Sequence, residues 1–169
     1  MWSWGAEVPE PALPLKEYRR FESFREYETL FDTLLTQTQT FIRVFDKSLP
    51  RAWNTSERNE VLRQFLRRDP ANRLMIVVHD ADNIDRELPR FADTLRDFSH
   101  AAKVRLTPKM AKHVYDPFIV FDASHYLHRF HHAHMRAAQG THDVDGAIEL
   151  LDRHAELWEV SSPISSSGV

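Results

Sequence analysis

Hydrophobic positions in the first half of the chain alternate between helix and strand spacing. Aromatic and leucine residues recur every three or four positions, which predicts an amphipathic helix over residues 20–38. The run TFIRVF predicts a strand that ends at Asp46, and the continuous apolar run 74–78 predicts a central strand covered on both faces. Between these strands, Asn54 and Glu57 have the spacing of a capping box and start a second predicted helix.

The pattern after the central strand is shaped by proline. Pro89 cannot lie inside a helix, so the third predicted helix begins there and runs to Phe98. Residues 103–106 alternate as a strand does, and residues 108–114 favour a single helical turn.

Two β-rich runs near residue 120 predict a hairpin. The run FIVF at residues 118–121 is apolar at every position, and YLHRF at residues 126–130 follows a short polar break. Ala123 and Ser124 in the break disfavour the positive φ of a two-residue turn, so we expect a longer loop.

A last helix is predicted with Asp143 as its cap. Its apolar stripe is expected to comprise Ile148, Leu151, Ala155 and Trp158. Alternation of helices and strands followed by a hairpin predicts an α/β fold with a mixed sheet flanked by helices.

Composition assigns one domain with two extensions. Residues 1–16 contain three prolines and predict an extended N-terminal arm, residues 17–160 form the folded domain, and residues 161–169 are serine-rich and predict a disordered tail. The 169 residues carry a net charge of −3, which argues against nonspecific nucleic-acid binding. No apolar run approaches the roughly 18 residues of a membrane span. The absence of cysteine excludes thiol chemistry and fits a cytoplasmic location.

The segment YDPFIVFDASHYLHRF, residues 115–130, resembles the most recognisable part of an uncharacterised bacterial domain family. That family is built on one half of the phospholipase D-like fold, and the resemblance covers roughly residues 18–160. It implies a phospholipase D-like half-domain. Two such halves pack together in the parent fold, so a homodimer is a possible partner arrangement.

Phospholipase D-like enzymes carry His-x-Lys-x4-Asp followed by Gly-Ser-x-Asn, and here this motif is degenerate. Asp122 takes the position of the aspartate, but Tyr115 replaces the attacking histidine and Pro117 replaces the lysine. Arg129 lies near the position of the Gly-Ser pair. None of the ten histidines is followed two residues later by lysine. Weak replacement candidates for catalysis are His113 and Tyr115, although a tyrosine nucleophile needs an activating base.

Arg129, His131 and Asp122 are the candidates for ligand binding. The planar guanidinium of Arg129 suits phosphate or carboxylate. An internal ion pair of Arg129 with Asp116 or Asp122 is an equally good interpretation.

Two groups of residues are weak candidates for a metal site. Strand alternation places His128 and His132 on one face of the hairpin, where imidazoles can bind zinc or copper. Asp46, Asp80 and Asp82 follow the ends of predicted strands and could hold magnesium. Aspartates also end strands as turn formers and histidines are often solvated, so no metal or cofactor is expected.

The sequence therefore predicts a noncatalytic binding or scaffolding module. Its partner is an unknown protein or a small phosphate-containing ligand, with nucleic acid disfavoured by the charge. The alternative is a phosphodiesterase or metal-dependent hydrolase with a rearranged histidine and aspartate site.

Overall fold

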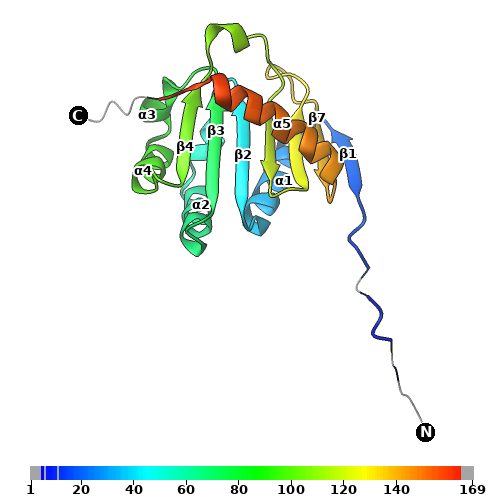
Figure 1. The fold of residues 1–169 in the computed structure, drawn as a ribbon. Coiled ribbons are helices and arrows are strands. Elements are labelled where there is room, and N and C mark those ends of the chain that lie inside the picture. Colours follow the sequence, from blue (N-terminus) through cyan, green and yellow to red (C-terminus); the bar gives the residue numbers. More distant parts are fainter. Residues whose placement is uncertain (1–4, 6, 11, 165–169) are drawn as a thin grey trace.

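A mixed sheet of eight strands forms the centre of the computed structural model, which describes residues 5, 7–10 and 12–164 (Figure 1). The strand order is β1-β7-β6-β5-β2-β3-β4-β8. The strands are β1 (Glu17–Phe21), β2 (Phe41–Asp46), β3 (Arg73–Val78), β4 (Ala102–Leu106), β5 (Phe118–Phe121), β6 (His125–Arg129), β7 (Ala137–Thr141) and β8 (Ser162–Pro163). The helices are α1 (Phe24–Gln37), α2 (Ser56–Arg68), α3 (Asn83–Glu87), α4 (Pro89–Asp97) and α5 (Val144–Val160), with short 3-10 helices η1 (Arg51–Asn54) and η2 (Lys109–Ala111). The predicted fold class is confirmed.

Strand direction changes between β2 and β5, in the middle of the sheet. Strands β2, β3 and β4 are parallel, whereas β5 is antiparallel to β2 and begins the meander β5-β6-β7. All four residues of β5 are buried, as its uninterrupted apolar sequence predicts. The helices that connect the parallel strands pack together on one face of the sheet.

The two faces of the sheet are covered unequally. Helices α1, α2 and α4 lie together behind the sheet in Figure 1, and α5 alone crosses its other face. The larger core cluster joins the sheet to α1, α2 and α4, with Leu35, Leu62 and Phe91 buried in it. The smaller cluster joins α5 to residues of the other face such as Phe45 and Phe118. No helix among the described residues is long and apolar enough to cross a membrane.

Strands β1 and β7 are absent from the pattern predicted by the sequence. Phe21, predicted to start a helix, instead ends β1, and α1 starts after Ser23, whose hydroxyl accepts the amide of Glu26 at 3.3 Å. Strand β7 is AAQGT, which lacks β-branched residues until its end. A Cβ atom on Gly140 would lie 2.2 Å from the ring of Tyr126, so close packing explains a glycine in this strand.

The ends of two further elements differ from the prediction or refine it. The hairpin loop comprises residues 122–124, and Phe121 pairs with His125, so the loop is longer than two residues as expected. The tail was predicted to be disordered from Ser161, but Ser161 is buried and Ser162–Pro163 pair with β4. Residues 165–169 lie outside the described residues.

Helix α5 begins at its predicted cap Asp143, whose carboxylate accepts the amide of Gly146 at 3.1 Å. The predicted buried stripe is wrong by one position. The buried residues are Ala147, Leu150, His154 and Leu157, whereas Ile148 is 47% exposed. Periodicity alone favoured Trp158 and Leu151, because a histidine is rarely chosen as the centre of a buried stripe.

His154 lies on the buried side of α5, between aromatic rings. Its side chain is 2% exposed and its ring stacks on that of Trp158 with a centroid distance of 5.9 Å. Its Nε2 atom has no hydrogen-bond partner among the described residues. Burial, and then the charge of Arg43, lower the pKa of His154 to about 4, against the opposing effect of the carbonyls of Met75 and Val44. His154 is therefore neutral in the folded protein at neutral pH.

Replacing His154 is expected to change how stability depends on pH. The folded-state pKa lies below the value near 6.5 of an unfolded histidine, so below pH 6.5 the unfolded chain binds a proton that the folded chain excludes. This proton uptake removes about 3 kcal/mol of unfolding free energy as pH falls from about 6.5 to about 4. Urea unfolding from pH 4 to pH 7.5 should show that His154→Leu lacks this loss. The exposed His100→Leu is the matched control, and parallel wild-type and His154→Leu curves would contradict a buried neutral imidazole.

Candidate functional site

Basic and imidazole side chains meet at the edge of the sheet where β2, β3 and β6 end. Because β6 is two antiparallel steps from β2, it runs in the same direction as β2 and β3 and ends at the same edge. The strands are followed by Lys47, His79 and the loop that carries His131 and His132, and Arg129 is the last residue of β6. We call Lys47, His79, Arg129, His131 and His132 the edge cluster.

Arg129 organises the loop after β6. Its Nη2 atom donates to the carbonyls of His132 and His134, each at 3.0 Å. The amide of His132 donates to the carbonyl of Tyr115 at 2.9 Å, which ties the loop to the segment before β5. The Nε atom of Arg129 is buried and has no partner within the described residues. The guanidinium thus fixes the loop while one of its donors stays unsatisfied by the described residues.

The aromatic and imidazole rings of this loop are close together. The centroid of the His131 ring lies 5.0 Å from the Tyr115 ring, 4.5 Å from His132 and 5.6 Å from His134. Burial lowers the pKa of His132, and the positive charges of His131, Lys47, Arg129 and His79 lower it further. Several groups that can carry positive charge thus share one small region.

His79 is held rigidly at the end of β3. One ring nitrogen bonds to the hydroxyl of Thr107 at 2.6 Å and the other to the carbonyl of Val114 at 2.5 Å. The ammonium of Lys112 also donates to the carbonyl of His79. Burial lowers the pKa of His79, with contributions from Lys112, His113 and Lys47. Both ring nitrogens are used internally, so His79 supports the site without a free nitrogen for a ligand.

Asp46 lies beneath the edge cluster, on the α1 side of the sheet. Burial raises its pKa to about 7, while the amide of Lys47, at 2.7 Å from Oδ1, and the charge of Arg129 favour its ionised form. Burial, and then the charge of Asp46, raise the pKa of the Tyr27 hydroxyl. Near neutral pH this carboxyl is poised between its neutral and charged forms.

The predicted catalytic candidates lie near the edge cluster but are not paired for chemistry. His113 is exposed, and its Nδ1 atom contacts the carbonyl of Met110 at 2.9 Å. Tyr115 is 53% exposed, and its hydroxyl has no hydrogen bond to a base among the described residues. Both residues lie in the turn and irregular segment that precedes β5, so no regular element fixes them relative to each other.

Arg129 makes neither of the ion pairs that the sequence offered as an alternative. Asp116 instead accepts from Arg153 in a two-point contact at 2.7 and 2.8 Å, and from Nε2 of His128 at 2.8 Å. Together these partners lower the pKa of Asp116 despite its burial. Arg153 belongs to α5, so no sequence pattern close to Asp116 could have identified it.

Asp122 stabilises the hairpin rather than facing the edge cluster. It has a positive φ of 55°, and its carboxylate accepts amides of Gln39, Thr40 and Phe41 at 2.8–3.4 Å, with the Thr40 hydroxyl at 2.7 Å. The carboxylate thus closes the start of β2 against the loop after β5. Asp122 follows the apolar strand as predicted, but its carboxylate bonds to the backbone at the start of β2 and not to a residue of the edge cluster.

The metal candidates do not converge. Among the described residues no group of three or more histidines and carboxylates could hold a metal ion. Asp46 and Asp80 bond to nearby amides, and Asp82 precedes α3 without a side-chain cap. His128 is engaged by Asp116, and His132 belongs to the edge cluster. The zinc interpretation rested on strand alternation and the magnesium interpretation on the ends of predicted strands, and neither pattern fixes the distances between side chains.

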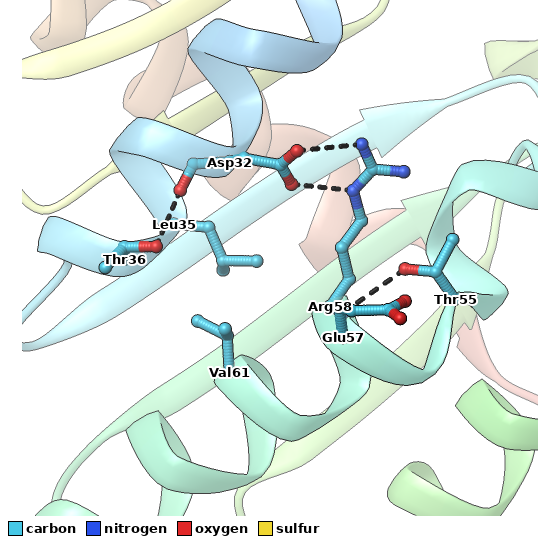
Figure 2. Close-up of a pocket in the computed structure, with 7 residues that line it drawn as sticks. All are labelled: Asp32, Leu35, Thr36, Thr55, Glu57, Arg58 and Val61. Carbon is cyan, nitrogen blue, oxygen red and sulfur yellow. Dashed lines mark hydrogen bonds and ion pairs between the residues drawn. The ribbon is translucent and has the colours of Figure 1, made fainter.

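A cavity of about 400 Å³ lies elsewhere, between α1 and α2 (Figure 2). Arg58 crosses it and donates to Asp32 at 2.7 and 3.0 Å. The amide of Arg58 is capped by Thr55 at 3.2 Å. Arg58 is already paired with Asp32, so the cation of this cavity is satisfied internally, unlike Arg129.

Lys47 and Tyr27 are the members of the site that the sequence did not identify. Lys47 follows Asp46 directly, and position after a strand end was the signal that could have found it. Tyr27 lies in the apolar stripe of α1. The spacing of that stripe does not distinguish a ring that only packs in the core from one that lies beside a buried carboxyl.

Comparisons with known proteins agree on the fold and assign no activity. A family model described as "Domain of unknown function (DUF7931)" matches residues 24–167. No curated protein matches the chain. Among solved structures, Nuc from Salmonella typhimurium, a phospholipase D family member, has a TM-score of 0.64 and 14% identity, with 90% of this chain and 100% of Nuc covered.

Two further structures are similar at comparable levels. NucT from Helicobacter pylori has a TM-score of 0.61 and 10% identity, with 89% of this chain and all of that chain covered. TrmBL2, an archaeal chromatin protein described as having a novel mode of DNA binding, has a TM-score of 0.62 and 13% identity, with 93% of this chain and 57% of that chain covered. The fold is therefore phospholipase D-like, as the resemblance predicts.

Replacing Asp122 should destabilise the protein. Asp122→Ala removes a charge-assisted acceptor shared by successive amides and leaves alanine at positive φ, so we expect a loss of about 2–4 kcal/mol in unfolding free energy. Asp122→Asn is the matched control with a smaller loss, because asparagine tolerates positive φ and retains an acceptor. Urea unfolding measures both. Equal losses for the two variants would show that the carboxylate contacts contribute little.

Proposed function

The chain belongs to this family of unknown function and has a phospholipase D-like fold, and from that premise we propose that it is a noncatalytic module that binds a phosphate-containing ligand at the edge cluster. The observation that carries the proposal is the guanidinium of Arg129, whose buried Nε has no partner among the described residues, and which acts on His132 together with the positive groups of Lys47, His131 and His79. Guanidinium and ammonium groups are the usual protein partners of phosphate.

Loss of catalysis is supported by the residues at the motif positions. Pro117 has no charge to neutralise a phosphate, and its carbonyl is already bonded to the amide of Arg129 at 2.8 Å. Tyr115 contacts the ring of His131 but has no hydrogen-bonded base among the described residues. A phenol without a base is a poor nucleophile near neutral pH. Binding without turnover is thus the function that fits these side chains best.

The affinity of the edge cluster for an anion is expected to depend on pH. Below pH 7 Asp46 is mainly neutral and does not offset the positive charges of Lys47 and Arg129. Above pH 7 Asp46 ionises and adds a negative charge beneath the cluster. Binding of an anion should therefore weaken as pH rises.

Phosphate binding tests this proposal. Titration of inorganic phosphate and phenyl phosphate at pH 6.5 should give saturable binding that Arg129→Gln and Lys47→Gln each weaken by about tenfold. Arg136→Gln is the matched control, because Arg136 lies in the same loop, is exposed and is expected to leave affinity unchanged. Isothermal titration calorimetry measures the affinities, and circular dichroism checks that the variants fold.

Two outcomes would contradict the proposal. Equal affinity for wild type and both variants would remove the edge cluster as the site. Turnover of bis-p-nitrophenyl phosphate, alone or with manganese or zinc, that is abolished by Tyr115→Phe, His113→Ala or Asp80→Ala would favour the phosphodiesterase or metal-dependent hydrolase.

At pH 8, Asp46→Asn should bind phosphate more tightly than wild type, because it cannot ionise. A single-stranded oligonucleotide is included as a ligand, since TrmBL2 is described as binding DNA.

The same premise leads us to propose a homodimer, because half-domains of the parent fold pack in pairs. Light scattering coupled to gel filtration at micromolar concentration is expected to give twice the monomer mass. A mass that stays at the monomer value across the concentration range would contradict the dimer while leaving phosphate binding by each chain open to its own test.

A further inference from the structure

The second face of the sheet is incompletely covered. Helix α5 crosses this face toward the carboxyl ends of β2–β4 and leaves the other half of these strands open (Figure 1). A groove of about 350 Å³ lies between α5 and the strands. Its lining includes Phe41, Arg43, Met75, Leu151, His154 and Trp158. This groove lies on the opposite face of the sheet from Asp46.

One flank of α5 is apolar where it borders the groove. Leu151, Ala155 and Trp158 line it, next to the buried stripe that holds the helix on the sheet. These are residues that the sequence pattern selected as the core-facing stripe. The helix thus has two neighbouring apolar strips, of which one is buried and one is left beside open space.

Arg43 gives the groove an uncompensated charge. It is half-buried, and its guanidinium lies 4.7 Å from the centroid of the Phe41 ring. Its one hydrogen bond among the described residues is to the carbonyl of the neighbouring Ile42 at 3.4 Å. Burial lowers the pKa of Arg43, with no carboxylate opposing the effect. A partly desolvated cation without a counter-charge gains when an anion binds beside it.

The strands beside Arg43 add further positive charge. Pairing of β2, β3 and β4 aligns Arg43 with Met75 and Lys103 in one row across the face. Arg105 lies 4.2 Å from the centroid of the Trp158 ring and donates to the carbonyl of Trp158 at 2.8 Å. None of these three cations forms an ion pair within the part of the chain that the structure describes. Glu159 is the acidic residue of the lining.

We propose that this groove binds a small organic anion, in which an apolar or aromatic body carries one carboxylate or phosphate group. The anionic group pairs with Arg43, and the body packs on Met75, Leu151 and the edge of Trp158. The cavity has the size and the mainly apolar lining of small-ligand sites.

The same geometry argues against nucleic acid in this groove. The ring of Phe41 is covered by Arg43, and the ring of Trp158 is covered by Arg105 and by His154. Stacking of successive bases needs free ring faces, and neighbouring side chains already occupy at least one face of each of these rings. Glu159 at the rim also disfavours a ligand with several negative charges.

Three matched probes test the proposal: 2-naphthoate, 2-naphthyl phosphate and the neutral 2-naphthamide. Methyl NMR of the Met75 side chain is expected to show saturable shifts, with one or both anions binding about tenfold more tightly than the amide. Comparison of the two anions distinguishes carboxylate from phosphate as the preferred group. Arg43→Gln should remove the preference for the anion.

Control variants keep the experiment decisive. Arg67→Gln removes a guanidinium that also lies over a ring, 5.7 Å from the centroid of Phe98 on the other side of the sheet, and should change nothing. Glu159→Gln should strengthen binding of the anions, and this variant does not touch the core. Three results would overturn the proposal: no binding of either anion up to about 10 mM, equal binding of the amide, or displacement of naphthoate by a thymidine decamer at lower concentration.

Discussion

The change of strand direction between β2 and β5 is the constraint on which the rest of the structure depends. Buried residues of the two strands meet there, with Val44 opposite Ile119 and Phe45 opposite Phe118. Parallel strands on one side need helical crossovers, whereas the antiparallel meander on the other side needs only short loops. The crossovers place α1, α2 and α4 on one face, and the meander brings the end of β6 beside the ends of β2 and β3. Both the edge cluster and the open groove follow from this junction.

Arginines in this protein have two distinct environments. Arg58 and Arg153 meet carboxylates in two-point contacts with Asp32 and Asp116, which satisfy their charge internally. Arg129 and Arg43 have no such partner among the described residues. Arg129 lies in the edge cluster, and Arg43 lines the groove beside α5. A protein gains little stability by holding a partly buried cation unpaired. This difference between paired and unpaired arginines is what separates structural positions from candidate binding positions.

Sequence patterns were sufficient for the elements that carry strong periodicity. Helix α2, strand β3 and the break at Pro89 were predicted because apolar spacing and proline act locally. Strands β1 and β7 were not, since a charged edge strand and a run of small residues lack alternation, and the glycine of β7 is explained only by the ring of Tyr126. In the site, position after a strand end located Asp46, and the motif alignment located Arg129. Pairing of Asp116 with Arg153 depends on residues far apart in the chain, which a single sequence does not reveal.

Strands β1 and β8 form the two borders of the sheet, and each limits association with other chains in a different way. An open border exposes amides and carbonyls that can template fibrous aggregation. Strand β1 carries Arg19 and Arg20, whose like charges repel a second copy aligned beside it. Strand β8 is two residues long and ends in Pro163, which lacks the amide needed to continue a ladder. A few residues at each border strand therefore disfavour polymerisation of the sheet. The two faces of the sheet can then vary in sequence for recognition without exposing a border to aggregation.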